Sequence, residues 1–407
     1  MKTKKVSLAV WIFAGMILGI LVGIAFQKNP AFAVNYIKPF GTIFLNLIKT
    51  IVVPVVFCSI ISGVMSMKDI KKVGTVGVKT VVFYTVTTCI AVTLGLVFAN
   101  VLNAGGGFKL TGEALAYEAK EAPSFMETFV NIFPSNFIQP LANATMLQVI
   151  VISLLFGFGV ISAGEKGQPF ANFIDSATEV CIKVMEIVIR LSPIGVFALL
   201  VPVIAENGID ILMPLLRLII VIYITYIVHM VVVYSFAAKS MARLSPLKFF
   251  KGMAPAMTMA FSSASSVGAL PLNIECCEKL GARKEITSFV LPLGATINMD
   301  GTAIYQGICA VFIAQVFGID LTIGQQVTIV LTATLASIGT AGVPGSGMIM
   351  LSMVLQSVGL PIEGIALVAG IDRILDMGRT TVNITGDAAC TVCVSAMEDK
   401  RAAGKVN

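Results

Sequence analysis

The chain has 407 residues and a formal net charge of +6, with 57% hydrophobic residues and only 12% charged residues. In a soluble globular domain about 25% of the residues are charged, so this chain has too few charges to cover a water-facing surface. The composition predicts an integral membrane protein with the lipid bilayer around it. It excludes a soluble enzyme, a disordered chain and a nucleic-acid-binding protein.

The basic residues lie in short clusters, and each cluster lies next to a long apolar run. The clusters fall at 2–5, 68–72, 239–251, 279–284 and 400–405. Cytoplasmic loops of membrane proteins carry such an excess of Lys and Arg. The clusters therefore predict a multi-pass protein of a cell inner membrane with both termini in the cytoplasm, and they indicate no nucleic-acid partner.

Long apolar runs follow one another in the first part of the chain and predict membrane helices. They cover residues 7–26, about 39–67, 80–103, 125–164, 172–204 and 211–238. The first run is longer than the apolar part of an ordinary signal peptide and is long enough to span a bilayer. The polar, Gly-rich segment 103–123 carries no basic excess, which predicts an external loop.

Residues 252–274 are uncharged, but a basic cluster flanks them on each side. A single membrane crossing would place one of these clusters outside the cell, against the usual distribution of Lys and Arg. The run has a serine-rich centre at 262–266 followed by Pro271, which suits a turn better than a lipid-facing helix. We therefore predict a hairpin at about 246–277 that enters and leaves the membrane on the cytoplasmic side.

A second run, 321–362, has 42 residues without a charge. A single helix of this length would be about 63 Å long, which is twice the hydrocarbon thickness of a bilayer. Its centre, 337–347, is rich in Gly and contains Pro344, so we predict a second hairpin at about 323–358 that opens to the outside. Irregular backbone at membrane depth is stable only where protein or a water-filled cavity satisfies its polar groups.

Each predicted hairpin is followed by a predicted helix, at about 284–316 and at about 364–396. The two units, 252–316 and 325–396, open to opposite sides of the membrane and form an inverted repeat. In secondary transporters the binding site lies between such repeats, where interrupted helices meet near the middle of the membrane. The pattern therefore predicts an all-α polytopic transporter.

The last predicted helix is unusually charged for an apolar segment, since it contains Asp372, Arg373, Asp376, Arg379 and Asp387. A charge at the centre of a membrane helix costs roughly 2.5–3.5 kcal/mol, so these residues are not incidental. Asp372, Asp376, Arg379, Asn383 and Asp387 are three or four residues apart, which places them on one helix face.

Two interpretations of this polar stripe are open. An ion pair between Asp376 and Arg379 could serve only to hold helices together. However, Thr380, Asn383 and Asp387 extend the stripe beyond what such a pair needs, which favours a binding site. An acidic substrate would place one carboxylate on Arg379 and an ammonium group on Asp376. The N-termini of the half-helices at the hairpin tips would bind its other carboxylate.

The preceding predicted helix contains Asn298, Asp300, Gly301 and Thr302. Carboxylate, amide and backbone oxygens replace the hydration water of a hard cation, and Gly301 would let the helix open and present carbonyl oxygens. A proton carrier and a hydrogen-bond acceptor between helices are the alternatives for Asp300. His229 stands alone in an apolar helix and is interpreted as a packing residue. The sequence has no phosphate-binding glycine loop, no Ser-His-Asp set and no metal-ligand cluster, so we do not expect an enzyme.

Four motifs carry a resemblance to a known family. They are the serine-rich segment 262–266, Gly-Ala-Thr-Ile-Asn-Met-Asp-Gly-Thr at 294–302, Ser-Ile-Gly-Thr-Ala-Gly-Val-Pro-Gly at 337–345, and Asp-Met-Gly-Arg-Thr-Thr-Val-Asn-Ile-Thr-Gly-Asp at 376–387. In this order they resemble the dicarboxylate/amino acid:cation symporter family, which contains archaeal and bacterial glutamate/aspartate transporters and their neuronal relatives. Weaker similarity, as at 193–198, extends over essentially the whole chain.

The resemblance implies a homotrimeric elevator-type transporter with eight transmembrane helices and two re-entrant helical hairpins in each protomer. A static scaffold would comprise residues 1–75, with the first two helices, and 121–205, with the fourth and fifth. A mobile transport domain would comprise 76–120, with the third helix and the external loop, and 206–407, with the sixth helix, both hairpins and the last two helices. The second hairpin would act as the extracellular gate.

The resemblance also implies ligands. Substrate ligands would be Ser266, Thr302, Asp376, Arg379, Thr380 and Asn383, with the backbone of Val343 and Gly347. Ligands of co-transported sodium ions would be Asn298, Asp300, Asn383 and Asp387, with Tyr84, Thr87 and Thr88. Thr296, Ser337, Ile338 and Thr340 would form a further cation site that the second hairpin closes.

One position departs from the family pattern. Archaeal relatives have an Arg just before the hairpin serines, where this chain has Ala264. Eukaryotic relatives have it on the last helix, at the position of Met377. Here Arg373 lies one turn before Met377 on the same helix face, and we expect it to take the equivalent role.

These observations predict a symporter that couples the inward flow of sodium ions to the uptake of aspartate or glutamate. Arg379 indicates an acidic substrate because a guanidinium can bind a carboxylate bidentately. Asp300 and Asp387, with Thr87 and Thr88, favour sodium over proton coupling. A proton-coupled C4-dicarboxylate carrier and a neutral amino-acid carrier of the same family are the alternatives, and a channel or receptor is the alternative of another class.

Overall fold

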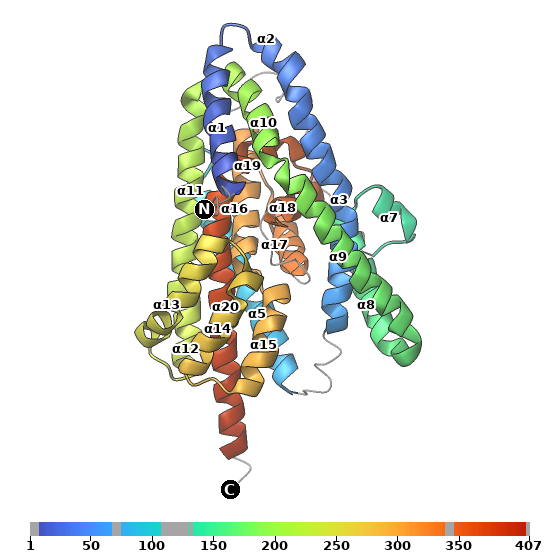
Figure 1. Ribbon diagram of the computed structural model, residues 1–407, viewed down its shortest axis with the longest axis vertical. Helices are drawn as coiled ribbons and strands as arrows, with labels where there is room; N and C mark the ends of the chain where they lie inside the picture. Colours follow the sequence, from blue (N-terminus) through green and yellow to red (C-terminus); the bar gives the residue numbers. More distant parts are fainter. Residues whose placement is uncertain (1–7, 67–74, 107–129, 131–132, 338–345, 404–407) are drawn as a thin grey trace, which may run out of the picture.

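The computed structural model describes residues 8–66, 75–106, 130, 133–337 and 346–403. Every regular element in these residues is a helix (Figure 1). Most of the predicted external loop and the predicted tip of the second hairpin, at 338–345, lie outside the described residues.

One group of helices comes mainly from the first half of the chain. Its longer members are α1 (Leu8–Ala25), α3 (Lys38–Ser66), α8 (Met146–Ala163), α9 (Gln168–Arg190) and α10 (Ser192–Asn207). Helix α1 packs along α10, and α3 packs against α8, α9 and α10. The short helices α2 (Pro30–Phe32) and α7 (Ile138–Ala142) lie at the edges of this group (Figure 1).

The span predicted at 172–204 is two helices in the structure, which corrects that prediction. Helix α9 ends at Arg190, α10 begins at Ser192, and Pro193 lies in the first turn of α10. Proline has no amide N–H to donate to the preceding turn, so it is tolerated at a helix start and interrupts a continuous helix.

A second group of helices surrounds α16. It contains α5 (Thr75–Val101), α11 (Leu212–Val228), α15 (Lys284–Ile297), α16 (Asp300–Val316) and α20 (Asp372–Ala403). Helix α11 continues through a π-helical segment, His229–Tyr234, into α12 (Ser235–Ser240). Helix α16 is buried along almost its whole length, as expected for a helix that is apolar on all sides and enclosed by protein.

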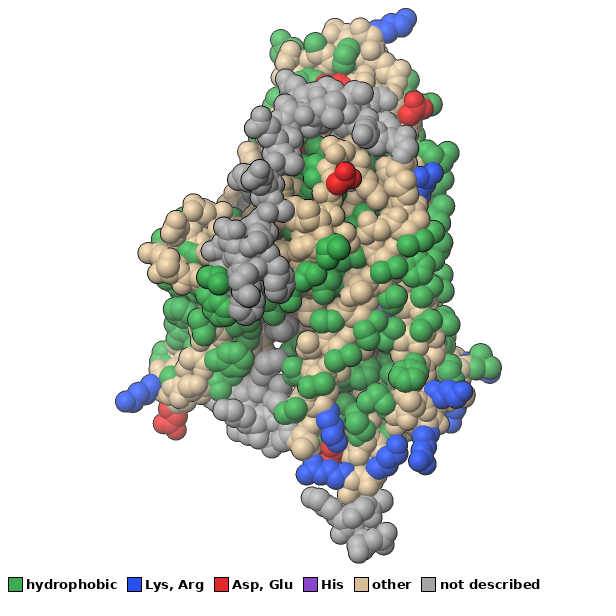
Figure 2. Space-filling view, turned by 180° about the vertical axis from the view of Figure 1, so that it is seen from behind, with side chains coloured by type: hydrophobic (Ala, Val, Ile, Leu, Met, Phe, Trp, Pro, Cys, Tyr) green, Lys and Arg blue, Asp and Glu red, His purple; other side chains and the backbone are tan. Residues whose placement is uncertain are grey.

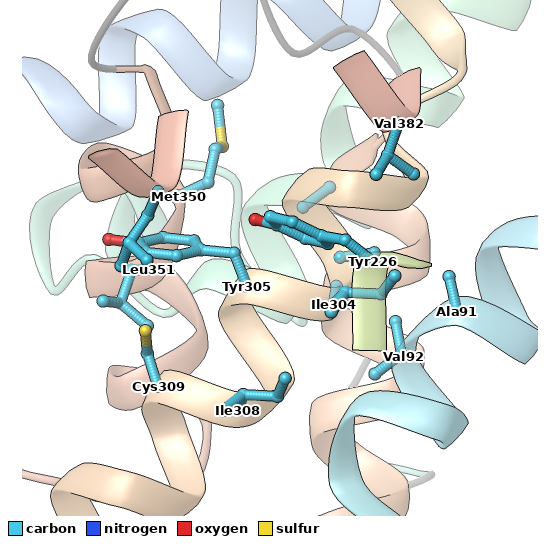
Figure 3. Packing of buried hydrophobic residues seen from close by; sticks show 14 of the residues in the cluster. Ala91, Val92, Tyr226, Ile304, Tyr305, Ile308, Cys309, Met350, Leu351 and Val382 are labelled. Atoms are coloured by element: carbon cyan, nitrogen blue, oxygen red, sulfur yellow. The ribbon is translucent and has the colours of Figure 1, made fainter. Parts of the chain in front are cut away.

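Neighbouring helices contribute side chains to the packing around α16. Figure 3 shows Ile304, Tyr305, Ile308 and Cys309 of α16 among Ala91 and Val92 of α5, Tyr226 of α11, Val382 of α20, and Met350 and Leu351 of α18. This packing fixes the position of α16, whose first residue is Asp300.

Two pairs of helices complete this group. Helices α13 (Pro246–Ser263) and α14 (Ser266–Lys279) pack against each other, and Ala264 between them has a φ of 51°. Helices α17 (Ile323–Ser337) and α18 (Ser346–Ser357) also pack against each other. The bounds of the two pairs are close to the hairpins predicted at about 246–277 and 323–358.

Both helices predicted after the hairpins are interrupted in the structure. The helix predicted at 284–316 breaks at Asn298 and Met299, which lie between α15 and α16 and have non-helical backbone angles. The break brings Gly301 against the backbone of Arg379, where a β-carbon would have no room. The helix predicted at 364–396 starts as the short α19 (Ile365–Ala369), and α20 then continues to Ala403.

Several helices have the length and composition that a membrane crossing requires. In the described part of the chain these are Thr75–Val101, Gln148–Val188, which includes the short 3₁₀ helix Gly164–Gly167, and Leu212–Ser240. Figure 2 shows hydrophobic side chains over the middle of one face of the molecule and Lys and Arg side chains gathered near its lower end. This distribution is typical of a multi-pass membrane protein.

An ion pair joins α5 to the C-terminal end of α20, beyond the predicted membrane span. Lys79 donates a hydrogen bond to Glu398 at 2.7 Å, and Arg401 lies 3.8 Å from the same carboxylate. The hydrogen bond from Lys79 lowers the pKa of Glu398 below its ordinary value. The pair therefore helps to keep α5 beside α20, although a partly exposed ion pair contributes only modestly to stability.

Candidate functional site

The polar residues predicted to be functional gather where α20 meets the break between α15 and α16. Helix α20 packs against α13, α14, α15 and α16. Helix α16 begins at this place with Asp300, and α18 begins beside Arg379. Free N–H groups at the start of a helix attract negative charge, so the arrangement suits an anionic ligand.

Arg379 lies about two turns from the start of α20 and is 2% exposed. Its Nε and Nη2 donate to Oδ1 of Asp376 at 3.0 and 2.6 Å, and its Nη1 lies 3.6 Å from Oδ1 of Asp372. Its guanidinium carbon is 4.7 Å from the centre of the Tyr305 ring, which is a cation–π contact. The ion pair that the sequence offers as an alternative to a binding role is therefore present, and Asp372 lies beside it.

This cluster of charges is incompletely paired. Among the described residues, Nη1 of Arg379 and Oδ1 of Asp372 have no hydrogen-bond partner although both atoms are buried. Nη1 lies against Gly347, the second residue of α18, where a β-carbon would collide with it. A buried donor without an acceptor is unfavourable, so Nη1 is available to an acceptor that comes from outside the protein.

The other described side chains predicted as substrate ligands are also buried. Thr380 follows it on α20, and Ser266 is the first residue of α14. Asn383 donates from Nδ2 to Thr302 Oγ1 at 3.4 Å and accepts the Gly301 amide at 2.8 Å. No described hydrogen bond joins Ser266 or Thr380 to the charged cluster.

A group of oxygen atoms forms around Asn298 and Asp387. Asn298 donates from Nδ2 to Oδ1 of Asp387 at 2.8 Å and to the carbonyl of Asn383 at 3.0 Å. Oδ1 of Asn298 is buried and has no partner among the described residues. A β-carbon on Gly294 would lie 2.5 Å from both Asp387 Oδ1 and the Tyr84 hydroxyl, so only glycine fits there. Carboxylate, amide and phenol oxygens at one place are suitable ligands for a hard cation.

A second group forms around Asp300, which is fully buried. Thr88 donates to its Oδ1 at 2.6 Å, Tyr234 donates to its Oδ2 at 2.8 Å, and His229 Nε2 lies 3.2 Å from Oδ2. Among the described residues, no Lys or Arg side chain pairs with Asp300 or Asp387. Because a buried carboxylate without a permanently charged Lys or Arg partner is unfavourable, both groups favour binding of a cation.

The remaining predicted cation ligands are not all in contact with these carboxylates. The Tyr84 hydroxyl donates to the carbonyl of Val290 at 3.2 Å, and Thr87 donates to the carbonyl of Tyr84 at 3.2 Å. In the predicted further site, Thr296 is exposed and donates to Leu293 at 2.9 Å, whereas Ser337 is buried and donates to Thr334 at 2.7 Å. No described contact joins Thr296 to Ser337. Ile338, Thr340 and Val343 lie outside the described residues.

Sequence reasoning overlooked two of the donors to Asp300. His229, interpreted as a packing residue, contacts the carboxylate directly, and Tyr234 was not singled out. The two are five residues apart, which in an α-helix would place them on different faces. In the structure they lie in a π-helical segment, whose wider turn puts them side by side. The lone His in an apolar predicted helix was the signal in the sequence.

Arg373 connects α20 to the end of α13. Its Nη2 donates to the carbonyl of Ser263 at 3.2 Å, and its Nη1 lies 3.9 Å from Oδ2 of Asp376. Ser263 is the last residue of α13, where free carbonyl groups favour a positive charge. Arg373 therefore contacts both the turn at Ala264 and the carboxylate that pairs with Arg379.

The atoms of the site that could coordinate a cation are mainly oxygens. In the described ranges, no three His, Cys, Asp or Glu side chains come together as a possible metal site. Apart from His229 Nε2 and Asn298 Nδ2, the groups around Asp300 and Asp387 consist of carboxylate, hydroxyl, amide and backbone oxygens. Such ligands suit hard cations better than soft transition metals.

Comparison with protein families gives a match over nearly the whole chain. The model of the sodium:dicarboxylate symporter family matches residues 8–397. This range includes every residue of the charged cluster and of both oxygen groups.

Comparison with characterised proteins gives similar results. The chain is 40% identical to the proton/sodium-glutamate symport protein of Geobacillus stearothermophilus, with 97% of this chain and 95% of the relative covered. It is 38% identical to the proton/glutamate-aspartate symporter of Escherichia coli, with 98% and 95% covered. It is 36% identical to C4-dicarboxylate transport protein 1 of Ralstonia nicotianae, with 96% and 92% covered.

Proposed function

Because the chain belongs to the sodium:dicarboxylate symporter family, and is therefore a membrane transporter and not an enzyme, we propose that it couples sodium influx to uptake of aspartate or glutamate. The observation that carries the proposal is the buried Arg379. It pairs with Asp376, lies beside Asp372, and keeps Nη1 without a hydrogen-bond partner among the described residues.

An acidic amino acid has the groups that this cluster lacks. Its side-chain carboxylate accepts hydrogen bonds from the Arg379 guanidinium, and its ammonium group pairs with Asp376. Asp372 then remains beside Arg379 as a counter-ion. The α-carboxylate binds at the helix starts near Ser266 and Gly347, because the first turn of a helix attracts negative charge. Thr302, Thr380 and Asn383, with the backbone of Val343, complete the proposed substrate site.

Sodium is the proposed coupling ion because two buried carboxylates lack a Lys or Arg partner in the described structure. Asp387, Asn298 and Asn383 supply oxygens to one ion, with Tyr84 nearby. Asp300, with Thr87 and Thr88, supplies oxygens to a second ion. Thr296, Ser337, Ile338 and Thr340 are proposed ligands of a further ion that the second hairpin encloses.

The proposed architecture is a homotrimer in a cell inner membrane with both termini in the cytoplasm. Each protomer has eight transmembrane helices and two re-entrant hairpins, α13–α14 and α17–α18. The scaffold is 1–75 and 121–205, and the transport domain is 76–120 and 206–407. The transport domain slides across the membrane as an elevator. The division is supported by the packing, in which α1 lies along α10 whereas α5 and α20 both pack on α16.

A proton-coupled C4-dicarboxylate carrier is the second candidate, since similar proteins with C4-dicarboxylate names cover almost the whole chain. A dicarboxylate has no ammonium group and needs no partner at Asp376. Asp376→Asn is therefore expected to abolish aspartate and glutamate uptake under our proposal. Retained succinate uptake by this variant, with no amino-acid uptake by the unmodified protein, would support the second candidate instead.

The test of the proposed function is uptake of radiolabelled L-aspartate, L-glutamate and succinate into proteoliposomes. A sodium gradient and a proton gradient are imposed in separate experiments. We expect accumulation of the amino acids with the sodium gradient alone. Accumulation with the proton gradient alone would contradict sodium coupling while leaving the substrate assignment in place. Accumulation of succinate alone would contradict the proposed substrate.

A further inference from the structure

We propose that Tyr234, assisted by His229, is a positioning residue for the cation site at Asp300. Their side chains hold one oxygen of this carboxylate and leave the other to the transported ion. The inference rests on the proposed function, in which Asp300 is a ligand of a transported sodium ion, and it assigns the residues that orient this ligand.

The local backbone brings the two side chains together. The π-helical segment His229–Tyr234 lies between α11 and α12. Five residues of an α-helix rotate a side chain by about 140° from the starting direction, so an uninterrupted helix would point His229 and Tyr234 to different neighbours. Here their ring centroids are 4.9 Å apart and the rings meet edge to face. Such wide turns occur frequently at functional sites.

The side chains of Tyr234 and His229 contact the same carboxylate oxygen of Asp300. Tyr234 donates to Oδ2 of Asp300 at 2.8 Å, and His229 Nε2 lies 3.2 Å from that oxygen. All three side chains are fully buried. In the tautomer with the proton on Nε2, His229 donates to Asp300, and its Nδ1 has no partner among the described residues. Thr88 is the one described hydrogen-bond donor to Oδ1, at 2.6 Å.

The Tyr234 hydroxyl also lies beside the oxygen group at Asn298 and Asp387. A β-carbon on Gly386 would be 2.5 Å from the Tyr234 hydroxyl and 2.6 Å from Nδ2 of Asn298. Gly386 therefore leaves space in which the hydroxyl and the amide approach each other. Since Asn298 also donates to Asp387, the bond from Tyr234 to Asp300 lies close to both proposed cation sites.

The physical effect of this arrangement is to fix the plane of the Asp300 carboxylate. A carboxylate rotates freely unless its oxygens have fixed partners, and two donors on Oδ2 remove that freedom. The lone pairs of Oδ1 then point in one direction, toward Thr88 and the ion. Groups that orient a metal ligand in this way typically contribute about 10-fold to 100-fold in metal affinity.

Sodium dependence of uptake tests the assignment in the full-length protein. The sodium concentration for half-maximal glutamate uptake is measured for the unmodified protein, Tyr234→Phe, His229→Gln and Tyr223→Phe. Tyr223 is the matched control, because its hydroxyl donates to the Ile374 carbonyl at 2.6 Å and so also joins α11 to the α20 region without reaching Asp300. Thermal unfolding of each purified variant reports its stability.

We expect Tyr234→Phe to raise the sodium concentration for half-maximal uptake about tenfold, with a smaller increase for His229→Gln. The KM for glutamate at saturating sodium is expected to change by less than about twofold, because the lost bond acts on the cation ligand. Tyr223→Phe is expected to keep the sodium dependence of the unmodified protein. If Tyr234→Phe does not give folded protein, the split between sodium dependence and KM in His229→Gln decides the question.

Three results would overturn the inference. Unchanged sodium dependence in Tyr234→Phe would show that Asp300 is oriented without it. An equal change in Tyr223→Phe, or a parallel rise in the KM for glutamate, would indicate a general structural effect. Uptake by the unmodified protein that needs no sodium would overturn the proposed sodium coupling and this inference together, whereas the first two results leave the proposed coupling intact.

Discussion

At the scale of single residues, the charges around Arg379 are balanced but not fully paired. Asp372 and Asp376 contribute two negative charges, and Arg373 and Arg379 contribute two positive ones. Asp376 contacts both arginines, while Nη1 of Arg379 has no hydrogen-bond partner in the described structure. An acidic amino acid has two carboxylates and one ammonium group, so its binding adds one negative charge to the buried cluster, and the proposed co-transported cations would balance it.

Arg379→Ala is expected to remove binding of acidic substrates. The substitution deletes the proposed carboxylate donor and should cost about 2–5 kcal/mol of binding free energy. Isothermal titration of the purified variant with aspartate and glutamate in sodium measures this loss. Arg217→Ala is the control, because Arg217 is exposed and donates to the Gly106 carbonyl at 2.9 Å, away from the site. Unchanged aspartate affinity in Arg379→Ala would contradict the assignment.

Gly294→Ala is expected to disrupt the oxygen group at Asp387. The added methyl would lie 2.5 Å from both Asp387 Oδ1 and the Tyr84 hydroxyl, so these atoms must move. We expect at least about a tenfold rise in the sodium concentration for half-maximal uptake. Gly159→Ala is the matched control, since nothing lies within 4 Å of the added methyl in α8. Equal sodium dependence in the two variants would argue against a cation site at Asp387.

At the scale of elements, helix ends determine where charge can be bound. Helices α14, α16 and α18 begin near the site, and α13 ends there at Ser263. The starts of the three helices favour negative groups, whereas the end of α13 favours a positive one. Arg373 satisfies the latter, since it donates to the Ser263 carbonyl at 3.2 Å. Helix α20 therefore holds the turn between α13 and α14 through a side chain.

Arg373→Ala is expected to weaken substrate binding more than sodium binding. The variant leaves the Ser263 carbonyl without this donor and removes a positive charge from Asp376. We expect a rise of about tenfold in the KM for glutamate, with little change in sodium dependence. Uptake kinetics at saturating sodium measure both quantities. Lys400→Ala is the control on the same helix, because Lys400 donates to Met241 far from the site. A KM equal in the two variants would show that Arg373 has no role in binding.

At the scale of the whole molecule, the two groups of helices meet through apolar contacts. Ile12, Val196 and Leu200 of α1 and α10 pack with Met348 of α18 and Ala369 of α19. Apolar contacts are non-directional, so such an interface can slide without breaking hydrogen bonds. The proposed elevator movement requires sliding at this place.

A cross-link across this interface is expected to stop uptake while leaving substrate binding intact. Leu200→Cys with Gly370→Cys joins α10 to the residue after α19, since a β-carbon on Gly370 would lie 3.2 Å from the Leu200 side chain. Leu200→Cys with Gly19→Cys is the matched control within the first group, with β-carbons 3.3 Å apart. Uptake and binding are measured before and after treatment with a short bifunctional thiol reagent. Full uptake by the cross-linked first pair would argue against the elevator.

Hydropathy and breaker residues determined most of the elements from the sequence alone. The runs at 7–26 and 39–67 correspond to α1 and α3, and the uncharged run 321–362 contains α17 and α18. These predictions succeeded because the length of an apolar run and the positions of Gly and Pro influence only the helix in which they lie. The division of 172–204 into two helices was missed because a single Pro in an apolar run is also compatible with a kinked helix.

For the site, the sequence by itself determined which residue types are present and that those of α20 share one face, because charges in apolar sequence are rare and helix periodicity is regular. Only the tertiary structure decided which of them meet. It brought Asn298 to Asp387 and placed Gly347 against Arg379. It also turned His229 and Tyr234 toward Asp300 through a π-helical segment. Contacts between helices depend on packing, backbone breaks and one wide turn, none of which follows from the spacing of residues along one helix.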